Sequence, residues 1–213
     1  MSAPETDATA AALRRALTGD PAAAAAAAER LVARAEREGL VDVAYATHET
    51  PLGTLTLAAT ERGLVRVALP GLAVDDVLAA LAGELSPRVL ELPARLDEPR
   101  RELDEYFAGR RRRFAVALDW ALVRSSFQRR VLREASRRLP FGATASYAEL
   151  AAWAGSPRAH RAAGSALARN PLPIVVPCHR VLRSGGALGR YGGGPEMKAA
   201  LLRLEHALPD VPA

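Results

Sequence analysis

The chain has 213 residues, of which 49% are hydrophobic, so it can bury the core of one large domain or of two small ones. No apolar run is long enough to span a membrane, the first ten residues lack the pattern of a secretory signal, and a single cysteine excludes an internal disulfide and a cysteine-rich zinc site. The net charge of +5 is uneven: residues 1–123 carry 15 Arg and Lys against 19 Asp and Glu, whereas residues 124–213 carry 14 against 5. The basic C-terminal part predicts a polyanionic partner such as nucleic acid, and improved solubility is the alternative.

Residues 1–40 predict a helical N-terminal extension. Asp20 and Pro21 form a start signal, because an aspartate can cap a helix and a proline suits its first turn. An alanine-rich stretch follows, and Gly39 is placed to end it. We expect an appended helix, and a helix that docks a partner is the alternative.

Residues 41–120 predict a domain of strands and helices whose sheet is antiparallel. The segments 43–49, 53–60 and 63–69 are rich in β-forming residues, are separated by turn residues, and alternate apolar with polar side chains. This pattern indicates a meander with one buried face. The other expected elements are helices at 73–85 and 98–109, a solvated arginine loop at 110–113 and a last strand at 114–120.

Residues 121–213 predict a mainly helical domain, so the fold class of the chain is α+β. Ser126 is placed to cap the first helix of this domain and Ser146 the second. The pair Ser156-Pro157 is expected to open the third, and two short helices joined by a tight turn are the layout of a helix-turn-helix. The third helix is almost bare of large side chains, so it can lie close to DNA or pack tightly on another helix.

The stretch NPLPIVVPCHR contains the only cysteine, Cys178, with His179 directly after it. A nearby imidazole is the usual acceptor of a thiol proton, so the pair predicts a nucleophilic, ionised thiol, with an inert buried cysteine as the alternative. Adjacent residues of a strand point to opposite sides, so the two can cooperate only across a backbone turn or a water, and the prolines favour such a bend. A carboxylate should orient the imidazole, and spacing leaves both Glu149 and Glu205 open.

These residues resemble the active-site signature of the O6-alkylguanine-DNA alkyltransferases, also called methylated-DNA–protein-cysteine methyltransferases. The resemblance is carried by PCHRV between NPLPIVV and LGRYGGG, by SYAELAAWAG and RAAGSALARNP in the helix-turn-helix, and more loosely by TPLGTLTLAATERGLVRVALPG and LDEYFAG. It covers about residues 43–208. It implies a ribonuclease-like domain at 41–120 and a winged-helix-like domain at 121–213 that binds DNA and accepts the alkyl group.

The resemblance also implies roles for individual residues. Cys178 would accept the alkyl group, His179 would activate it through a water, and Glu205 would orient His179. Tyr147 would crowd the neighbouring phosphate and protonate the departing base, and Arg161 would fill the space that the extruded nucleotide leaves. The other positions are Asn170 as a brace of the turn, Arg180 as a support, Ala159, Gly164 and Arg169 at the DNA, and Pro173, Val181, Gly189, Tyr191 and Gly192 around the base. Apart from the resemblance, the small size of Gly189 near Tyr191 predicts room for alkyl groups larger than methyl.

The implied function is DNA repair by irreversible transfer of the alkyl group of O6-alkylguanine, and also of O4-alkylthymine, to Cys178, once per molecule. The base would be flipped out from the minor groove, because the alkyl group is buried in the duplex. We expect a cytoplasmic monomer whose partner is double-stranded DNA with an alkylated guanine, with no cofactor, no metal and no membrane contact. His160 and Gly192 depart from residues common in the family, and they put the fit to DNA and base in doubt.

Two functions of other classes are the alternatives. A non-enzymatic protein that only binds the lesion would lack the thiol, which is present here. A thiol hydrolase or redox enzyme would leave the basic helix-turn-helix without a purpose.

Overall fold

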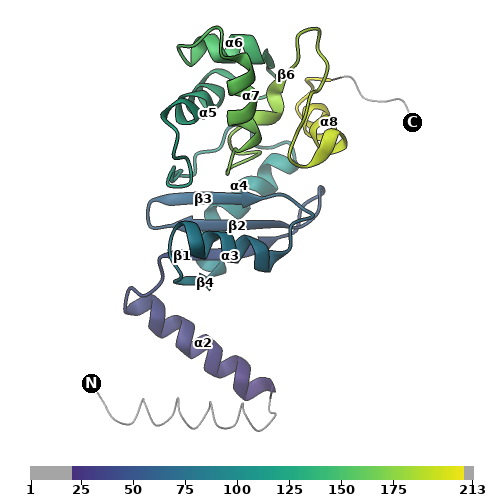
Figure 1. Cartoon of the computed structure of the whole chain (residues 1–213). Coiled ribbons are helices and arrows are strands. Elements are labelled where there is room, and N and C mark those ends of the chain that lie inside the picture. Colours follow the sequence, from purple (N-terminus) through teal and green to yellow (C-terminus); the bar gives the residue numbers. More distant parts are fainter. Residues whose placement is uncertain (1–20, 209–213) are drawn as a thin grey trace.

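The computed structural model of the chain describes residues 21–208. The N-terminal part is a β-sheet with a helix on each face, and the C-terminal part is a group of short helices stacked above it (Figure 1). The sheet has four strands, β1 (Val43–His48), β2 (Leu55–Thr60), β3 (Gly63–Ala68) and β4 (Val89–Glu91), in the order β3-β2-β1-β4.

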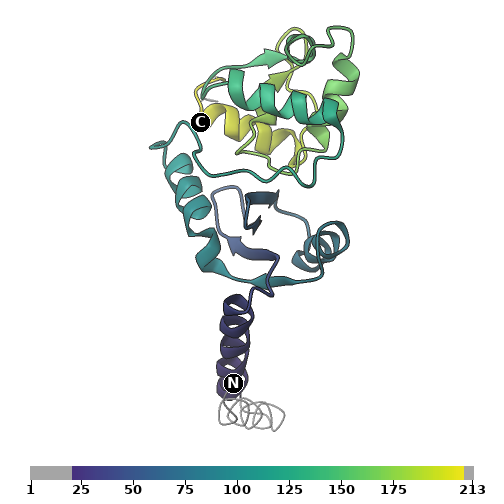
Figure 2. The same ribbon diagram turned by 90° about the vertical axis from the view of Figure 1, so that its left-hand side faces the viewer.

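Helix α2 (Pro21–Arg37) projects from the sheet on the side away from the C-terminal part (Figures 1 and 2). Gly39 follows its end with a φ of 65°, a left-handed value that glycine adopts without steric cost. The last turns of the helix contact the sheet domain through Val32 and Ala35. The predicted helix is therefore present over 21–37, and the rest of the predicted extension, residues 1–20, lies outside the described part of the chain.

The sheet is mixed, so the prediction of an antiparallel sheet is wrong for one strand. β1, β2 and β3 are antiparallel neighbours, whereas β4 runs parallel to β1 with Ala44 beside Leu90. The reason is that helix α3 (Val74–Glu84) carries the chain from the β3 edge across to the β4 edge. A crossover through a helix returns the next strand in the same direction as the one it left.

Strand β2 is buried on both faces, although its alternating sequence predicts one buried face. On one face Ala58 lies in a cluster with Val77 of α3. On the other face Leu55 and Leu57 lie in the main core, which includes Leu103 of helix α4 (Asp97–Phe107), and a short 3-10 turn, η1 (Pro93–Leu96), precedes that helix. A threonine in a central strand tolerates burial, so alternation alone did not reveal the second covered face.

The predicted strand over 114–120 is an extended segment with one isolated bridge, from Leu118 to Leu64 of β3. Gly63 opens β3 with a φ of 130°, and a Cβ at this position would lie 2.3 Å from the carbonyl oxygen of Ala117. Only glycine allows the two backbones to come this close. The segment thus covers part of the β3 edge on its way to the C-terminal part.

The C-terminal part contains α5 (Ser126–Arg138), α6 (Tyr147–Trp153), α7 (His160–Ala168) and α8 (Gly194–Leu204), with the short strands β5 (Ala145–Ser146) and β6 (Val181–Leu182) paired in parallel. Helices α5, α6 and α7 pack on one another around Val131, Leu150 and Ala163. The pair α6 and α7 has the predicted helix-turn-helix order. None of the helices within residues 21–208 has the length and apolarity that crossing a membrane requires.

Two helix starts differ from the prediction. Ser125, not Ser126, caps α5, because its side chain accepts the N–H of Gln128 at 3.4 Å. Helix α7 begins at His160 rather than directly after Pro157, since a turn of the backbone lies between them. Both errors are shifts along the chain within correctly predicted elements.

Ser146 caps α6 as predicted, in a reciprocal capping box with Glu149. The Ser146 hydroxyl accepts the Glu149 N–H at 3.2 Å, and Glu149 Oε2 accepts the Ser146 N–H at 2.7 Å. This carboxylate is therefore occupied at the start of α6, which leaves Glu205 as the candidate partner of His179.

Candidate active site

The segment between α7 and β6 presents the cysteine on an irregular stretch of backbone, and all residues from 171 to 180 are buried. Asn170 braces the stretch: its Nδ2 donates to the carbonyl of Val176 at 3.0 Å and to Cys178 Sγ at 3.2 Å, and its Oδ1 accepts the N–H of Leu172 at 3.0 Å. Ile174 has a φ of 72°, a left-handed value that a β-branched residue rarely adopts. Contacts with the surrounding structure therefore impose this bend.

Two contacts from other elements fix the ends of the stretch. The N–H of Val67, at the edge of β3, donates to the carbonyl of Pro171 at 2.8 Å. The buried side chain of Gln128, on α5, donates from Nε2 to the carbonyl of Arg169 at 2.9 Å and to that of Ala166 at 3.4 Å. The sheet edge and α5 thus hold the segment on which the cysteine is presented.

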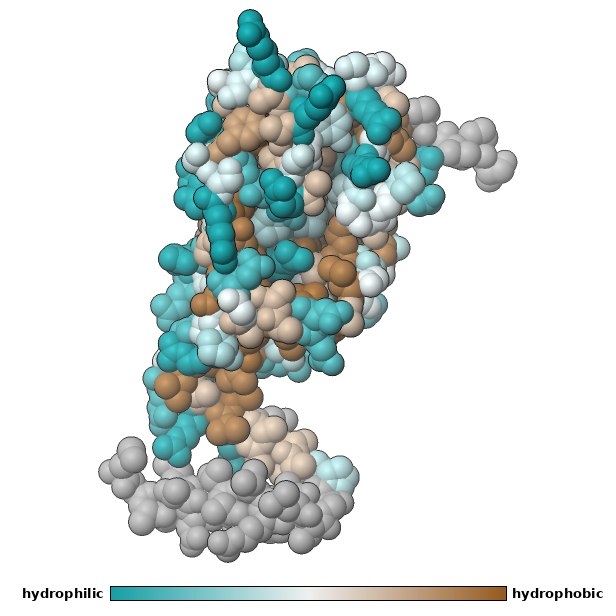
Figure 3. All heavy atoms as spheres, viewed as in Figure 1, coloured by the Kyte–Doolittle hydropathy of each residue, from teal (hydrophilic) through white to brown (hydrophobic). Residues whose placement is uncertain are grey.

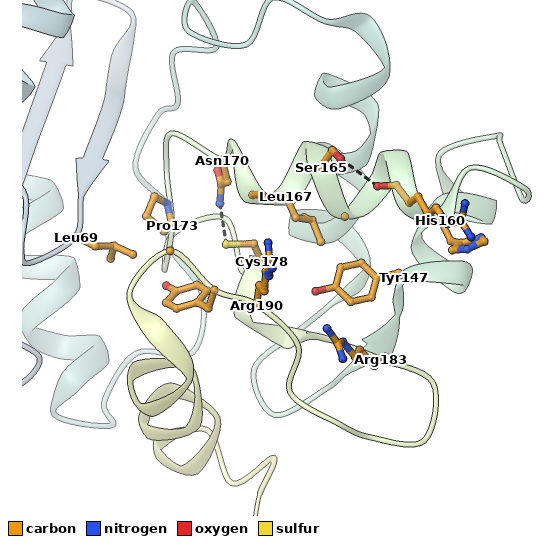
Figure 4. A pocket seen from close by; sticks show the side chains of 15 residues that line it. Leu69, Tyr147, His160, Ser165, Leu167, Asn170, Pro173, Cys178, Arg183 and Arg190 are labelled. Carbon is orange, nitrogen blue, oxygen red and sulfur yellow. Dashed lines mark hydrogen bonds between the residues drawn. The ribbon is translucent and has the colours of Figure 1, made fainter.

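Cys178 begins the 3-10 turn η2 (Cys178–Arg180) and lines an open cavity of about 640 Å³. Tyr147 of α6 and Asn170 flank the sulfur, and the Tyr147 hydroxyl points into the cavity (Figure 4). Leu69, which follows β3, closes the side toward the sheet. Hydrophilic side chains stand out from the surface over α6 and α7 (Figure 3). The cavity is therefore apolar inside, hydrophilic around its mouth, and open to a ligand of the size of a nucleobase.

His179 is completely buried beside Cys178 and belongs to a relay of polar side chains. Its Nε2 lies 2.9 Å from Glu205 Oε1, at the end of α8, whereas its Nδ1 has no hydrogen-bond partner among residues 21–208. Glu205 also accepts two bonds from Arg180, at 2.7 and 2.8 Å, and one from the Tyr106 hydroxyl at 2.6 Å. An ionised carboxylate only accepts, so His179 donates its Nε2 proton and keeps the lone pair of Nδ1 as a base.

Burial and hydrogen bonds together set the protonation states of Glu205, His179 and Cys178. It would raise the pKa of Glu205, but hydrogen bonds from His179 and Arg180 outweigh it and hold that pKa at about 2. Burial lowers the pKa of His179 against the pull of Glu205, so the imidazole is neutral at neutral pH. Burial raises the pKa of Cys178, although Asn170 opposes it. The predicted ionised thiol is therefore wrong for the resting protein, and the proton must leave during the reaction.

Two family models match the chain, described as 6-O-methylguanine DNA methyltransferase, ribonuclease-like domain, over residues 43–120, and 6-O-methylguanine DNA methyltransferase, DNA binding domain, over residues 126–207. The constitutive methylated-DNA–protein-cysteine methyltransferase of Bacillus subtilis (strain 168) is 41% identical over 162 residues, which are 76% of this chain and 94% of that protein. The chain belongs to the 6-O-methylguanine DNA methyltransferase family. The methylated-DNA–protein-cysteine methyltransferase of Mus musculus is 38% identical over 76% of this chain and 80% of its own.

Solved structures of methyltransferases agree with this assignment. The crystal structure of the O6-methylguanine methyltransferase of Mycobacterium tuberculosis superposes with a TM-score of 0.67 at 36% identity, and it covers 78% of this chain and 95% of that chain. The crystal structure of OGT in complex with DNA, from the same organism, has a TM-score of 0.66 at 36% identity, over 76% and 92% of the two chains.

The structure gathers most of the residues that the family resemblance singles out, but not all of them, around one cavity. His179 and Glu205 lie behind the cavity wall, in the relay. Val181 is buried, and Ala159, Arg169 and Gly189 do not line the cavity. The predicted residues that line it are Tyr147, Arg161, Gly164, Asn170, Pro173, Cys178, Tyr191 and Gly192.

The structure shows why a glycine stands at position 189. Its φ is 70°, and a Cβ there would lie 3.1 Å from the Tyr147 hydroxyl. The turn and the closeness to Tyr147 therefore both favour glycine here, and room for alkyl groups larger than methyl stays a prediction. Within residues 21–208, no group of three or more His, Cys, Asp or Glu could hold a metal ion.

Several contacts of the site were not predicted from the sequence. Tyr106 reaches Glu205 from α4, 99 positions away along the chain, and Arg180 proves to be a full partner of the same carboxylate. Lys198, the only lysine, is buried, and burial lowers its pKa to about 8. It donates to the carbonyl of Val181 at 2.6 Å and to the carbonyl of Leu188. Its isolation among arginines was the one available signal. Leu69, His160, Ser165, Arg183 and Arg190 also line the cavity.

Proposed function

We propose that this chain repairs alkylated DNA by transferring the alkyl group from O6 of guanine, or from O4 of thymine, to its own Cys178. One observation carries the proposal: the only cysteine of the chain lines an open cavity, and a neutral histidine bonded to a buried carboxylate is the next residue. The names of the relatives and the DNA complex of a neighbour support this reaction and this partner. A single thiol functions best where disulfides do not form, which favours the cytoplasm.

The reaction needs one proton to leave the thiol and one to reach the base. His179 Nδ1 takes the thiol proton, directly or through one water, and Glu205 stabilises the imidazolium that forms. The sulfur forms a bond to the alkyl carbon as the carbon–oxygen bond breaks, and that electron pair passes to the base. Tyr147 then protonates the base, since burial raises the pKa of this phenol and keeps its proton in place until that step. The proton that His179 took returns through water to the Tyr147 phenolate, so the net transfer is of one proton from the thiol to the base. The products are a thioether and an unmodified base, and no other reactant is consumed.

The thioether explains why each molecule should react once. An acyl-enzyme offers a carbonyl that water can attack, whereas a thioether has none. The protein is therefore a stoichiometric acceptor.

The face of α7 fits a role at the DNA. Gly164 is close to Tyr147, since a Cβ there would lie 3.6 Å from its ring, and Ala159 precedes the helix. Such a helix lets its backbone approach the duplex, where a base must be flipped out to reach the sulfur. Arg161 lines the cavity mouth and is the side chain placed to occupy the gap, and Arg169 is placed to contact phosphates.

Cys178→Ala provides the decisive test. The wild-type protein should gain the mass of one methylene after incubation with a duplex that contains O6-methylguanine, with a stoichiometry of one per molecule. The variant should bind that duplex but gain no mass. Methyl transfer to the variant would refute the assignment of Cys178, and an unchanged mass of the wild-type protein together with tight lesion binding would favour the non-enzymatic alternative.

Arg161→Ala tests base flipping separately from chemistry. We expect the rate of transfer from the methylated duplex to fall by about tenfold or more, because the gap in the stack is no longer filled, while the rate with the free O6-methylguanine base stays within about twofold. The matched control is Arg158→Ala, an exposed arginine just before α7 that does not line the cavity. Equal losses on duplex and free base would contradict the role given to Arg161.

A further inference from the structure

A second cavity, of about 330 Å³, lies on the other side of the active-site segment. Val175 and Pro177 line it, whereas Cys178 lines the first cavity, and no residue lines both. The rest of its wall comes from the loop after α4, from the C-terminal half of α5 with the two residues that follow it, and from Arg180 of η2. In Figure 2 the loop after α4 and the helices α6 and α7 lie at opposite sides of the C-terminal part. A duplex bound over α7 would therefore leave this cavity free.

The wall of the second cavity is strongly basic. It contains no aspartate or glutamate, and Ser136 adds a hydroxyl. Five arginines line it, namely Arg112, Arg113, Arg133, Arg137 and Arg180. A set of this size on a surface away from the DNA-facing helix is not explained by the function proposed above.

Three of these arginines have no carboxylate partner among residues 21–208. Within residues 21–208, Arg112, Arg113 and Arg133 form no ion pair with a carboxylate, whereas Arg137 pairs with Glu134 at 2.7 Å and Arg180 with Glu205. Like charges held close together repel one another, so an unpaired cluster favours a bound anion.

The arginines are positioned by contacts that do not cancel their charge. The guanidinium of Arg133 lies 5.8 Å from the centre of the Trp120 ring, and that of Arg112 lies 5.6 Å from the centre of the Phe141 ring. The loop that carries Arg112 is tied down at its base, because buried Glu102 bonds to backbone N–H groups just beyond it. These contacts hold the exposed side chains of Arg112 and Arg133 beside the cavity.

We propose that this arginine cavity is a phosphate-binding site. Guanidinium groups bind phosphate oxygens through paired N–H donors, and a concave site with several of them suits one phosphate group rather than a flat surface. The phosphate belongs to a free phosphate or nucleotide, or to the backbone of a second stretch of DNA. Trp120 and Phe114, also in the wall, provide apolar surface beside the phosphate for the remainder of such a ligand.

Calorimetric titration of the full chain with inorganic phosphate, and then with deoxyadenosine monophosphate, tests the site. The double variant Arg112→Ala/Arg133→Ala should bind both at least fivefold more weakly than the wild-type protein. Arg30→Ala/Arg101→Ala, which removes two exposed arginines outside the cavity, and Arg183→Ala/Arg190→Ala, which removes two from the first cavity, should each change the affinity less than twofold. Absence of saturable binding to the wild-type protein, or equal losses in all three double variants, would overturn the proposal.

A second arm identifies the source of the phosphate. Cys178→Ala is first saturated with a lesion-containing duplex, and a labelled, undamaged single strand is then added. Binding of the strand that is lost in the additional Arg112→Ala/Arg133→Ala background assigns the site to DNA backbone. If phosphate or nucleotide binds but the strand does not, the site is assigned to small phosphorylated ligands. If neither kind of ligand shows binding that depends on Arg112 and Arg133, the proposed site is disproved. Failure here would leave methyl transfer to Cys178 untouched, so the two proposals fail separately.

Discussion

Two buried glutamates, one in each part of the molecule, have similar surroundings and different partners. Glu102 of α4 is 2% exposed, and it accepts the N–H groups of Ala115 at 2.8 Å and Val116 at 3.2 Å while it pairs with Arg111 at 3.1 Å. Glu205 is 1% exposed and also pairs with an arginine. Both carboxylates are therefore compensated buried charges of the kind that a fold must satisfy.

The difference lies in the remaining bonds. Those of Glu102 go to backbone groups and fix a loop. Those of Glu205 go to His179, to the Tyr106 hydroxyl and, at 3.5 Å, to the N–H of Gly142, and His179 is a group that can change its protonation state beside the thiol. Burial and an ion pair alone thus do not distinguish a reactive carboxylate from a structural one, whereas a titratable partner that is next to a cavity does.

Glu205→Gln should slow the reaction more than any change at Glu102 or at Tyr106. The amide keeps the shape but removes the negative charge that stabilises the imidazolium, so we expect methyl transfer from a lesion duplex to slow by about 100-fold. The rate is measured in single-turnover experiments by the gain of intact mass. It should be measured below the melting temperature of the variant, because Arg180 loses its countercharge.

Tyr106→Phe is the matched control for this change. It removes the hydrogen bond to the same carboxylate at 2.6 Å and leaves the charge in place. We expect a loss of about 1 to 2 kcal/mol in the free energy of unfolding and less than about fivefold in the rate. A rate loss as large as that of Glu205→Gln would mean that packing around the carboxylate, rather than its charge, governs the reaction.

Glu102→Gln tests whether the glutamate of α4 is structural only. The amide loses the charge that accepts the N–H groups of Ala115 and Val116, whereas Arg111 keeps its ion pair with Glu105 at 2.8 Å, so we expect the free energy of unfolding to fall by about 2 kcal/mol. The transfer rate of the folded variant should stay within about twofold of the wild-type rate. Urea denaturation and single-turnover kinetics give the two quantities. A tenfold slower transfer in a fully folded sample would show that the loop after α4 acts on the site after all.

The same contrast explains what the sequence could and could not predict. The cysteine–histidine pair, the capping serine of α6 and the order of helices were predictable, because each depends on residues a few positions apart. Spacing could not give the partners of the two glutamates, and only the family resemblance pointed from Glu205 to His179. Tyr106 and Glu205 are 99 positions apart and come together only when the two parts of the molecule pack. For the same reason, spacing alone left Glu149 and Glu205 undecided until the capping box accounted for the first.

Acidic pH should lower the free energy of unfolding of the wild-type protein more than that of Glu205→Gln. The folded-state pKa of Glu205, about 2, lies below the ordinary value of 4.5, so its contribution to stability is fully present above pH 4.5 and is lost as the pH falls toward 2. Between pH 7 and pH 3 this carboxylate should account for a loss of about 2 kcal/mol in the free energy of unfolding, which the glutamine variant lacks. Urea denaturation at the two pH values measures the difference, with Tyr106→Phe as the variant that keeps the carboxylate. If the gap in stability between the wild-type protein and Glu205→Gln did not narrow on acidification, the bonds from His179 and Arg180 would not favour the ionised form of Glu205, and the placement of the His179 proton on Nε2 would lose its physical basis.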